Sequence, residues 1–189
     1  MWSIEEIKNY LNKSLTSSRY NHVIGVVATA KSLAKQYNCD INKAEIAALC
    51  HDAAKNIDNT ELFKIMKEHN IELSIDEINT KNIWHAIVGP IVSKEVFGIV
   101  DEDILNAIRW HTTGRENMST LEKIIYLADV IEPSRKFNGI EAIRECALKD
   151  LDAAMVMALT HTTIYLLERG FAVDINTVKA RNYFLYNEK

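Results

Sequence analysis

Apolar residues recur at steps of three and four along most of the chain, and no stretch alternates steadily between apolar and polar residues. The first pattern is typical of helices that bury one face, whereas half-buried strands would show the second. The pattern predicts about nine or ten helices. They are expected near residues 3–15, 19–37, 42–53, 60–69, from 82 to Pro90 and beyond, 101–114, 119–133, 139–149, 151–169 and 176–186.

Several of these helices carry recognisable boundary signals. Ser3 with Glu6, and Ser119 with Glu122, have the spacing of capping boxes, in which two side chains satisfy each other's free backbone amides. Pro90 lies inside an otherwise helical pattern. We expect it to kink or split that helix, because proline lacks the amide donor and crowds the preceding turn.

Composition favours one all-helical domain. Six glycines and two prolines among 189 residues provide few tight turns, which argues against a many-stranded sandwich. The length suits one large core and is short for two full-sized domains. We therefore expect an all-α fold, a single helical domain over residues 1–189, with its chemistry-bearing motifs at about 19–135 and C-terminal helices at 139–186.

Charge and cysteine usage exclude several partners. The 22 basic and 26 acidic side chains give a net charge of −4, which argues against a general nucleic-acid binder. No apolar run approaches the roughly 18 residues that span a bilayer, and the N-terminus lacks a signal-peptide core. Three cysteines without framework spacing indicate reduced thiols. We expect a cytoplasmic protein with no membrane or nucleic-acid partner.

Candidate chemistry lies among the six histidines and their carboxylate neighbours. His51 and Asp52 form the one histidine–aspartate dipeptide, and His22 lies on the preceding predicted helix. Asp129 interrupts the apolar stretch IIYLADVIEP, where an unpaired buried carboxylate would be costly. A cation is one possible partner. Imidazole nitrogens and carboxylate oxygens together suit a divalent ion such as Fe, Mn, Zn or Ni.

The order His22, His51-Asp52, Asp129 resembles the signature of HD-domain metal-dependent phosphohydrolases, and His85 and His111 between them match members with an extended, often binuclear, site. Over about residues 19–182 the sequence is similar to that of the bacterial YqeK-type family of symmetrical diadenosine tetraphosphate hydrolases. The matching segments are RYNHVIGV at 19–26, CHDAAK at 50–55, WHAIVGP at 84–90, HTTGREN at 111–117, YLADVIEPSR at 126–135 and FAVDINTVKARN at 171–182.

The resemblance implies a metal site made of His22, His51, Asp52 and Asp129. A metal held there would lower the pKa of a bound water and polarise a phosphoryl oxygen. Iron is the expected metal, with Mn, Ni, Co or Zn as alternatives, in one or two ions. Asp52 is expected to orient the water or bridge two ions, and Lys55, one turn further on, to hold a phosphate or orient Asp52.

The remaining expected contacts surround the substrate. His85 and His111 either contact phosphate or bind a second metal. After His111, a turn permitted by Gly114 would leave hydroxyls and amides free for phosphate oxygens. Phosphate contacts are expected from Thr112, Thr113, Gly114, Arg115 and Arg135, with Arg19 and Arg115 the weaker basic candidates. The resemblance also implies nucleoside contacts from Ala172, Val173, Asp174, Ile175, Asn176 and Thr177.

The implied reaction is hydrolysis of diadenosine tetraphosphate at its central bridge, which yields two ADP. Two alternatives stay open: another HD-superfamily nucleotide phosphohydrolase (nucleotidase, deoxynucleotide triphosphohydrolase or phosphodiesterase), and a nucleotide-binding regulator without turnover. His69 is interpreted as a solvated surface residue and His161 as a buried or half-buried residue with satisfied polar atoms. Glu132 receives no role, and the apolar helix faces are compatible with a homodimer.

Overall fold

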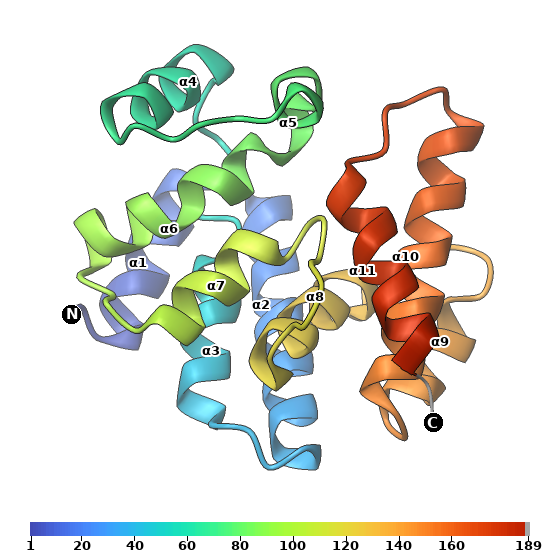
Figure 1. Cartoon of the computed structure of the whole chain (residues 1–189). Coiled ribbons are helices and arrows are strands. Elements are labelled where there is room, and N and C mark those ends of the chain that lie inside the picture. The colour runs from blue at the N-terminus through green and yellow to red at the C-terminus, as the bar shows by residue number, and fades with distance from the viewer. Residues whose placement is uncertain (188–189) are drawn as a thin grey trace.

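The computed structural model describes residues 1–187, and within them every regular element is a helix (Figure 1). The α-helices are α1 (Ile4–Ser14), α2 (Ser17–Gln36), α3 (Ile41–Cys50), α4 (Asn59–Glu68), α5 (Ile75–Asn79), α6 (Trp84–Phe97), α7 (Glu102–Trp110), α8 (Thr120–Ile131), α9 (Ile140–Ala147), α10 (Leu151–Glu168) and α11 (Ile175–Asn187). A 3₁₀ turn, Lys81–Ile83, precedes α6. The all-α prediction is confirmed, and the expected count of nine or ten is close.

The centre of the fold is formed by α2, α3, α7 and α8, which pack on one another. Small side chains allow this close approach, because Ala30 and Ala34 of α2 and Ala44 and Ala47 of α3 are completely buried. Helix α6 packs on α7 and carries α4 on its other side. Helices α9, α10 and α11 form a second group that joins the centre through α8 (Figure 1).

Both predicted capping boxes are present, at the starts of α1 and α8. A third, Ser74 with Glu77, begins α5, a helix that the periodicity did not predict. Five residues are too few to show a helical period, so the capping pair was the only signal in the sequence. Helix α5 leads into the 3₁₀ turn, and Asn79, Thr80 and the turn line a cavity described below.

Pro90 does not split its helix, because α6 runs from Trp84 to Phe97 as one element. The cost of an internal proline is about 3 kcal/mol. Most of α6 is buried, and the burial of its apolar side chains offsets that cost. Gly89 helps this packing, since a Cβ there would lie only 2.8 Å from Cγ2 of Ile108. None of the described helices is long and apolar enough to span a membrane.

Asp101 supplies a pH-dependent contribution to stability. Its Oδ1 accepts hydrogen bonds from the amides of Asp103 and Ile104 at the start of α7. The Lys43 ammonium lies 2.8 Å from its Oδ2 and holds the pKa of this carboxyl below its usual range. A carboxyl with a lowered folded-state pKa stabilises the protein above its unfolded pKa, about 3.9, and less as pH falls through the folded value.

We therefore expect Asp101→Asn, which retains the amide cap, to lower the free energy of unfolding at pH 7 by up to about 1 kcal/mol. The difference from wild type should be smaller at pH 3, because this contribution is lost as pH falls through the lowered folded-state pKa. Urea unfolding at both pH values measures it, with Asp58→Asn, at the N-cap of α4, as the control. A difference that persists unchanged at the lower pH would contradict the assignment to the Lys43 pair.

Candidate metal centre

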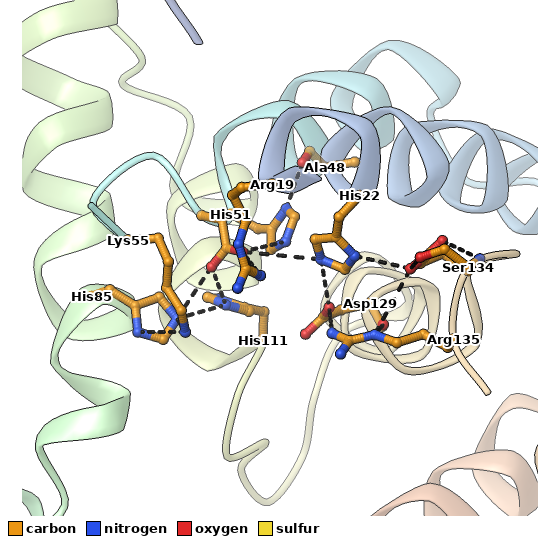
Figure 2. A network of polar contacts seen from close by, with 12 residues as sticks. Arg19, His22, Ala48, His51, Lys55, His85, His111, Asp129, Ser134 and Arg135 are labelled. Carbon is orange, nitrogen blue, oxygen red and sulfur yellow. Dashed lines mark hydrogen bonds and ion pairs between the residues drawn. The ribbon is translucent and has the colours of Figure 1, made fainter. Parts of the chain in front are cut away.

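Four predicted ligands come together from three parts of the chain, and Figure 2 labels His22, His51 and Asp129 among them. His22 lies on α2, Asp129 on α8, and His51 and Asp52 directly after α3. His22 Nε2 is 3.0 Å from Oδ1 of Asp129 and 4.0 Å from Oδ2 of Asp52. His51 Nε2 is 3.5 Å from the same Oδ2 of Asp52. The facing atoms of His22, His51 and Asp129 are close enough together to share one ion.

The His51-Asp52 segment differs from the sequence prediction. We expected a helix through Ala53, but α3 ends at Cys50 and residues 51–57 form turns. The amide of Ala53 bonds to the carbonyl of Cys50, and that of Lys55 to Asp52, so the chain tightens to three-residue turns. His51 and Asp52 are nevertheless both buried. Apolar periodicity could not reveal this change, because it does not distinguish the last helical turn from a tighter one.

Each of three histidines is oriented by its Nδ1 atom. His51 Nδ1 lies 2.6 Å from the carbonyl oxygen of Ala48, and His111 Nδ1 lies 2.7 Å from that of Ile108. Both histidines follow the end of a helix, where the last carbonyls lack helical partners. Donation from Nδ1 satisfies such a carbonyl and leaves the Nε2 lone pair available to a ligand. His22 is held in the same way by Glu132, whose Oε1 is 3.0 Å from Nδ1.

Glu132 is the important residue that sequence reasoning missed. It is almost fully buried just after α8. Its carboxylate also accepts hydrogen bonds from the backbone amide and hydroxyl of Ser134. Burial opposes the charged form, but the Ser134 bonds and His22 outweigh it and lower the pKa of Glu132. Glu132 lies just before Pro133 and is not part of a periodic pattern of apolar residues. Its role in orienting His22 is therefore visible only from the proximity of the two side chains in the structure.

Unpartnered atoms and donor chemistry both fit a divalent metal. With Nδ1 donating, the buried Nε2 atoms of His22 and His51 carry lone pairs that face carboxylate oxygens, so they make no hydrogen bond within residues 1–187, which is unfavourable unless a cation lies between them. Ligand atoms at right angles on one ion, each about 2.1 Å away, lie about 3 Å apart. The separation between His22 and Asp129 matches that spacing. Mixed imidazole and carboxylate donors suit first-row divalent ions.

The charges around the centre reinforce one another. Burial opposes the ionised form of Asp129, but His22, His51 and Arg135 hold the pKa of that carboxyl well below its usual range. Burial likewise disfavours charged His51, yet the Asp52 and Asp129 carboxylates raise its pKa. Protons therefore compete with a metal for the His51 nitrogen.

Asp52 has a second set of neighbours on its other oxygen. Its Oδ1 lies 3.3 Å from Nε2 of His85 and 3.8 Å from Nε2 of His111. The Lys55 ammonium lies 3.2 Å and 3.3 Å from the two ring nitrogens of His85 (Figure 2). Burial lowers the pKa of Lys55 and, together with His111 and Lys55, that of His85. Asp52 thus lies between two groups of imidazoles.

The arginines divide between the site and other roles. Arg19, a weaker candidate in the sequence, lies 2.8 Å from Oδ2 of Asp52. Arg135 bonds to the backbone carbonyl and to Oδ1 of Asp129. Arg115 instead pairs through two nitrogens with the buried carboxylate of Glu122, at 2.7 Å and 3.0 Å. That pairing leaves Arg115 without a visible part in the centre.

Two neighbouring cavities, which share Thr112, lie at the centre and next to it. One, of about 360 Å³, is lined by Thr112 and Thr113, the turn before α6, and residues after α10, including Ala172, Asp174 and Thr177. Val173, Ile175 and Asn176, which were also expected to contact the nucleoside, are not among the lining residues. Oγ1 of Thr112 and Oδ2 of Asp174 are buried without a hydrogen bond in the described chain. The other cavity, of about 490 Å³, includes Lys55, His111, Thr112, Asp129 and Arg135 in its wall.

Gly114 shapes the loop between these cavities and α11. Its φ of +67° is the left-handed conformation that glycine adopts without strain, as the predicted turn requires. A Cβ at this position would lie 3.3 Å from Ala180 and 3.4 Å from Leu159. Gly114 therefore lets the loop pack closely against α10 and α11, and its contribution to the site is through the position of Thr112 and Thr113.

Gly25 makes room for Glu132, and this gives a prediction. A Cβ at Gly25 would lie 2.7 Å from Oε2 of Glu132, so Gly25→Ala should displace the carboxylate from His22. We expect Mn²⁺ affinity to fall by about tenfold, the lower end for loss of a ligand-orienting contact. Calorimetric titration measures this, with Ile24→Ala on the same helix as control. Unchanged affinity in Gly25→Ala would show that Glu132 does not need its present position.

Comparison with known proteins agrees with this geometry. The HD domain model matches residues 19–134. The symmetrical bis(5'-nucleosyl)-tetraphosphatase of Halalkalibacterium halodurans is 45% identical over 177 residues, 93% of each chain. The protein of the same name from Bacillus subtilis is 38% identical over 181 residues, 96% of this chain and 97% of that one.

A solved structure shares the whole fold. The crystal structure of a predicted HD superfamily hydrolase involved in NAD metabolism, from Clostridium acetobutylicum, superposes with a TM-score of 0.96 at 44% identity and covers 100% of both chains. This chain therefore belongs to the HD-domain family, in the group of the symmetrical bis(5'-nucleosyl)-tetraphosphatases.

Proposed function

We propose that this protein is a metal-dependent phosphohydrolase that cleaves diadenosine tetraphosphate with water into two ADP. The observation that carries the proposal is the buried cluster of three imidazoles and two carboxylates beside two cavities. The full-length similarity to proteins named symmetrical bis(5'-nucleosyl)-tetraphosphatase supports this substrate over those of other HD phosphohydrolases. The absence of any replaced ligand argues against a regulator without turnover.

In this proposal His22, His51, Asp52 and Asp129 hold the first divalent ion, and iron is its expected identity. When bound, the ion lowers the pKa of a water molecule and polarises a phosphoryl oxygen. Either one or two ions per chain are compatible with this arrangement, because the two oxygens of Asp52 face different imidazoles. With one ion, His85 and His111 contact phosphate; with two, they become ligands of the second.

The basic groups neutralise the tetraphosphate. Arg135 presents a planar guanidinium suited to two phosphate oxygens, and Lys55 adds a cation on the His85 side. Asp52 and Lys55 are the proposed catalytic residues: Asp52 orients the attacking water by accepting its hydrogen bond, and Lys55 binds a non-bridging phosphate oxygen. Positioning and charge stabilisation then supply most of the rate, as in phosphoryl transfer generally.

The 360 Å³ cavity is the proposed site of one nucleoside. Its unpartnered Asp174 carboxylate oxygen can accept from an exocyclic amine or a ribose hydroxyl, and the Thr112 hydroxyl can donate to phosphate. Ala172 and Thr177 complete the wall on the α11 side. This arrangement supports the predicted nucleoside role of Ala172, Asp174 and Thr177.

Product analysis tests the proposal directly. Protein purified without added ions is analysed for metal, loaded with Fe²⁺ under anaerobic conditions, and incubated with diadenosine tetraphosphate. We expect ADP as the sole nucleotide product, with two formed per substrate consumed. AMP with ATP, or release of adenosine, would indicate another phosphohydrolase activity. Tight ADP binding without any turnover would indicate a regulator.

We further propose that the chain is one domain, acts in the cytoplasm and forms a homodimer. Cys39 and Cys50 are thiols, as expected in a reducing compartment.

Met157, Ile164 and Leu167 lie on one face of α10, with Phe171 just beyond it, and all four are exposed. Such a row favours an interface. Light scattering should give twice the chain mass for wild type and a monomer for Leu167→Lys; a monomeric wild type would overturn the dimer.

A further inference from the structure

The 490 Å³ cavity has a wall that the proposed chemistry does not use. On one side it is lined by residues of the centre, among them His111 and Asp129. On the other side its wall is formed by Lys136, Phe137 and His161, with Tyr165 beside them. These residues come from the loop after α8 and from α10, and none of them is among the proposed metal ligands.

Phe137 and His161 form a stacked aromatic pair. Their ring centroids are 4.0 Å apart and the ring planes are inclined by 26°. Both side chains are half-buried. The sequence predicted a buried or half-buried histidine at position 161, but it did not predict the partner, which lies 24 positions earlier in the chain. Two stacked rings in a cavity wall provide a flat apolar surface on which a nucleobase can stack.

The cavities follow one another in a series with the metal centre in the middle. The 490 Å³ cavity shares Thr112, Thr162 and Leu166 with the 360 Å³ nucleoside cavity. At its other end it shares Lys136 and Phe137 with a third cavity of about 500 Å³. Metal ligand Asp129 lines only the middle member of this series.

A substrate cut at its centre requires this kind of arrangement. The two halves of diadenosine tetraphosphate are identical, so a nucleoside must extend from the cleaved bridge in each direction. One direction leads to the cavity with Asp174, and the other leads past Arg135 to Lys136 and Phe137. Two cations followed by an aromatic surface match the order of phosphates and base along half of the substrate.

We propose that Phe137 and His161 are the stacking platform for the second nucleoside, with Lys136 at the adjoining phosphate. The proposal rests on the proposed hydrolase function and assigns a specificity-determining role to residues outside the metal centre. It predicts a preference for dinucleoside over mononucleoside tetraphosphates, because only the former fill both ends of the series.

The test compares two substrates that differ by one nucleoside. Phe137→Leu removes the ring but keeps apolar bulk, and Phe137→Trp restores a ring. We expect Phe137→Leu to raise KM for diadenosine tetraphosphate by about tenfold to a hundredfold. Its KM for adenosine 5'-tetraphosphate should stay at the wild-type value, and Phe137→Trp should recover most of the loss.

The control is Phe63→Leu, since Phe63 is a partly exposed phenylalanine stacked on Trp84 away from these cavities. A KM change in Phe137→Leu that is equal for both substrates, or no change for either, would overturn the second subsite. Equilibrium dialysis with ADP gives an independent measure. We expect two ADP bound per metal-loaded wild-type chain and one per Phe137→Leu chain.

The two proposals fail in different ways. If wild type releases no ADP from either substrate, the hydrolase function is wrong. The ADP stoichiometry then decides the subsite alone: two ADP falling to one in the variant supports it, and equal stoichiometry in both proteins overturns it.

Discussion

Replacing Asp52 with alanine is expected to lower kcat/KM for diadenosine tetraphosphate by at least about 10³-fold and to strip the protein of metal. Each oxygen of Asp52 faces a different pair of imidazoles, so one substitution removes a carboxylate from the proposed first ion and from the imidazoles proposed to hold a second. The metal contributes several kcal/mol to stabilisation of the transition state, and each 1.36 kcal/mol is a factor of ten in rate.

Metal content by mass spectrometry and steady-state kinetics measure the two effects together. Asp76→Ala, at an exposed carboxylate in α5, is the matched control and should retain both metal and activity. Because Asp52 is buried beside Arg19, Asp52→Asn is included to keep the side-chain volume, and thermal unfolding confirms that each variant is folded. Wild-type turnover in folded Asp52→Asn would remove Asp52 from the centre.

Replacing Glu132 with alanine is expected to lower metal affinity by about tenfold to a hundredfold, although Glu132 is not a proposed ligand. Partners that hold the far nitrogen of a ligating histidine have effects of this size. Its Oε1 lies 3.0 Å from Nδ1 of His22, so its loss frees that ring to rotate away from Asp129. Glu132→Gln should have a smaller effect, because its amide oxygen can still accept from Nδ1.

Calorimetric titration with Mn²⁺ measures the affinities, and Glu116→Ala, at an exposed carboxylate, is the control. The order of Mn²⁺ affinities among the variants is more informative than their absolute values. If Glu132→Gln bound Mn²⁺ as weakly as Glu132→Ala, the negative charge of Glu132 would matter more than its hydrogen bond to His22. Wild-type affinity in Glu132→Ala would show that the His22 ring is oriented by packing alone.

Helical periodicity predicted nearly every long element, because side-chain direction within a helix repeats every 3.6 residues whatever lies around it. The sequence-based prediction failed where a helix is too short to show the repeat, and where tertiary packing overrides the local preference. Helix α5 has five residues, and the end of α3 tightens into turns that no apolar spacing reveals. Helix α6 continues through Pro90 because its burial outweighs the local cost.

The sequence by itself determined that the protein is all-helical and which side chains could form a metal site. The resemblance of their order to the HD-domain signature selected His22, His51-Asp52 and Asp129, and their residue types agree with that choice. Only the tertiary structure decided the partners: Glu132 against His22, Glu122 against Arg115, and Phe137 against His161. His22 and Glu132 are 110 positions apart. Such contacts depend on how helices pack on one another, and a local hydrophobic pattern carries no information about that packing.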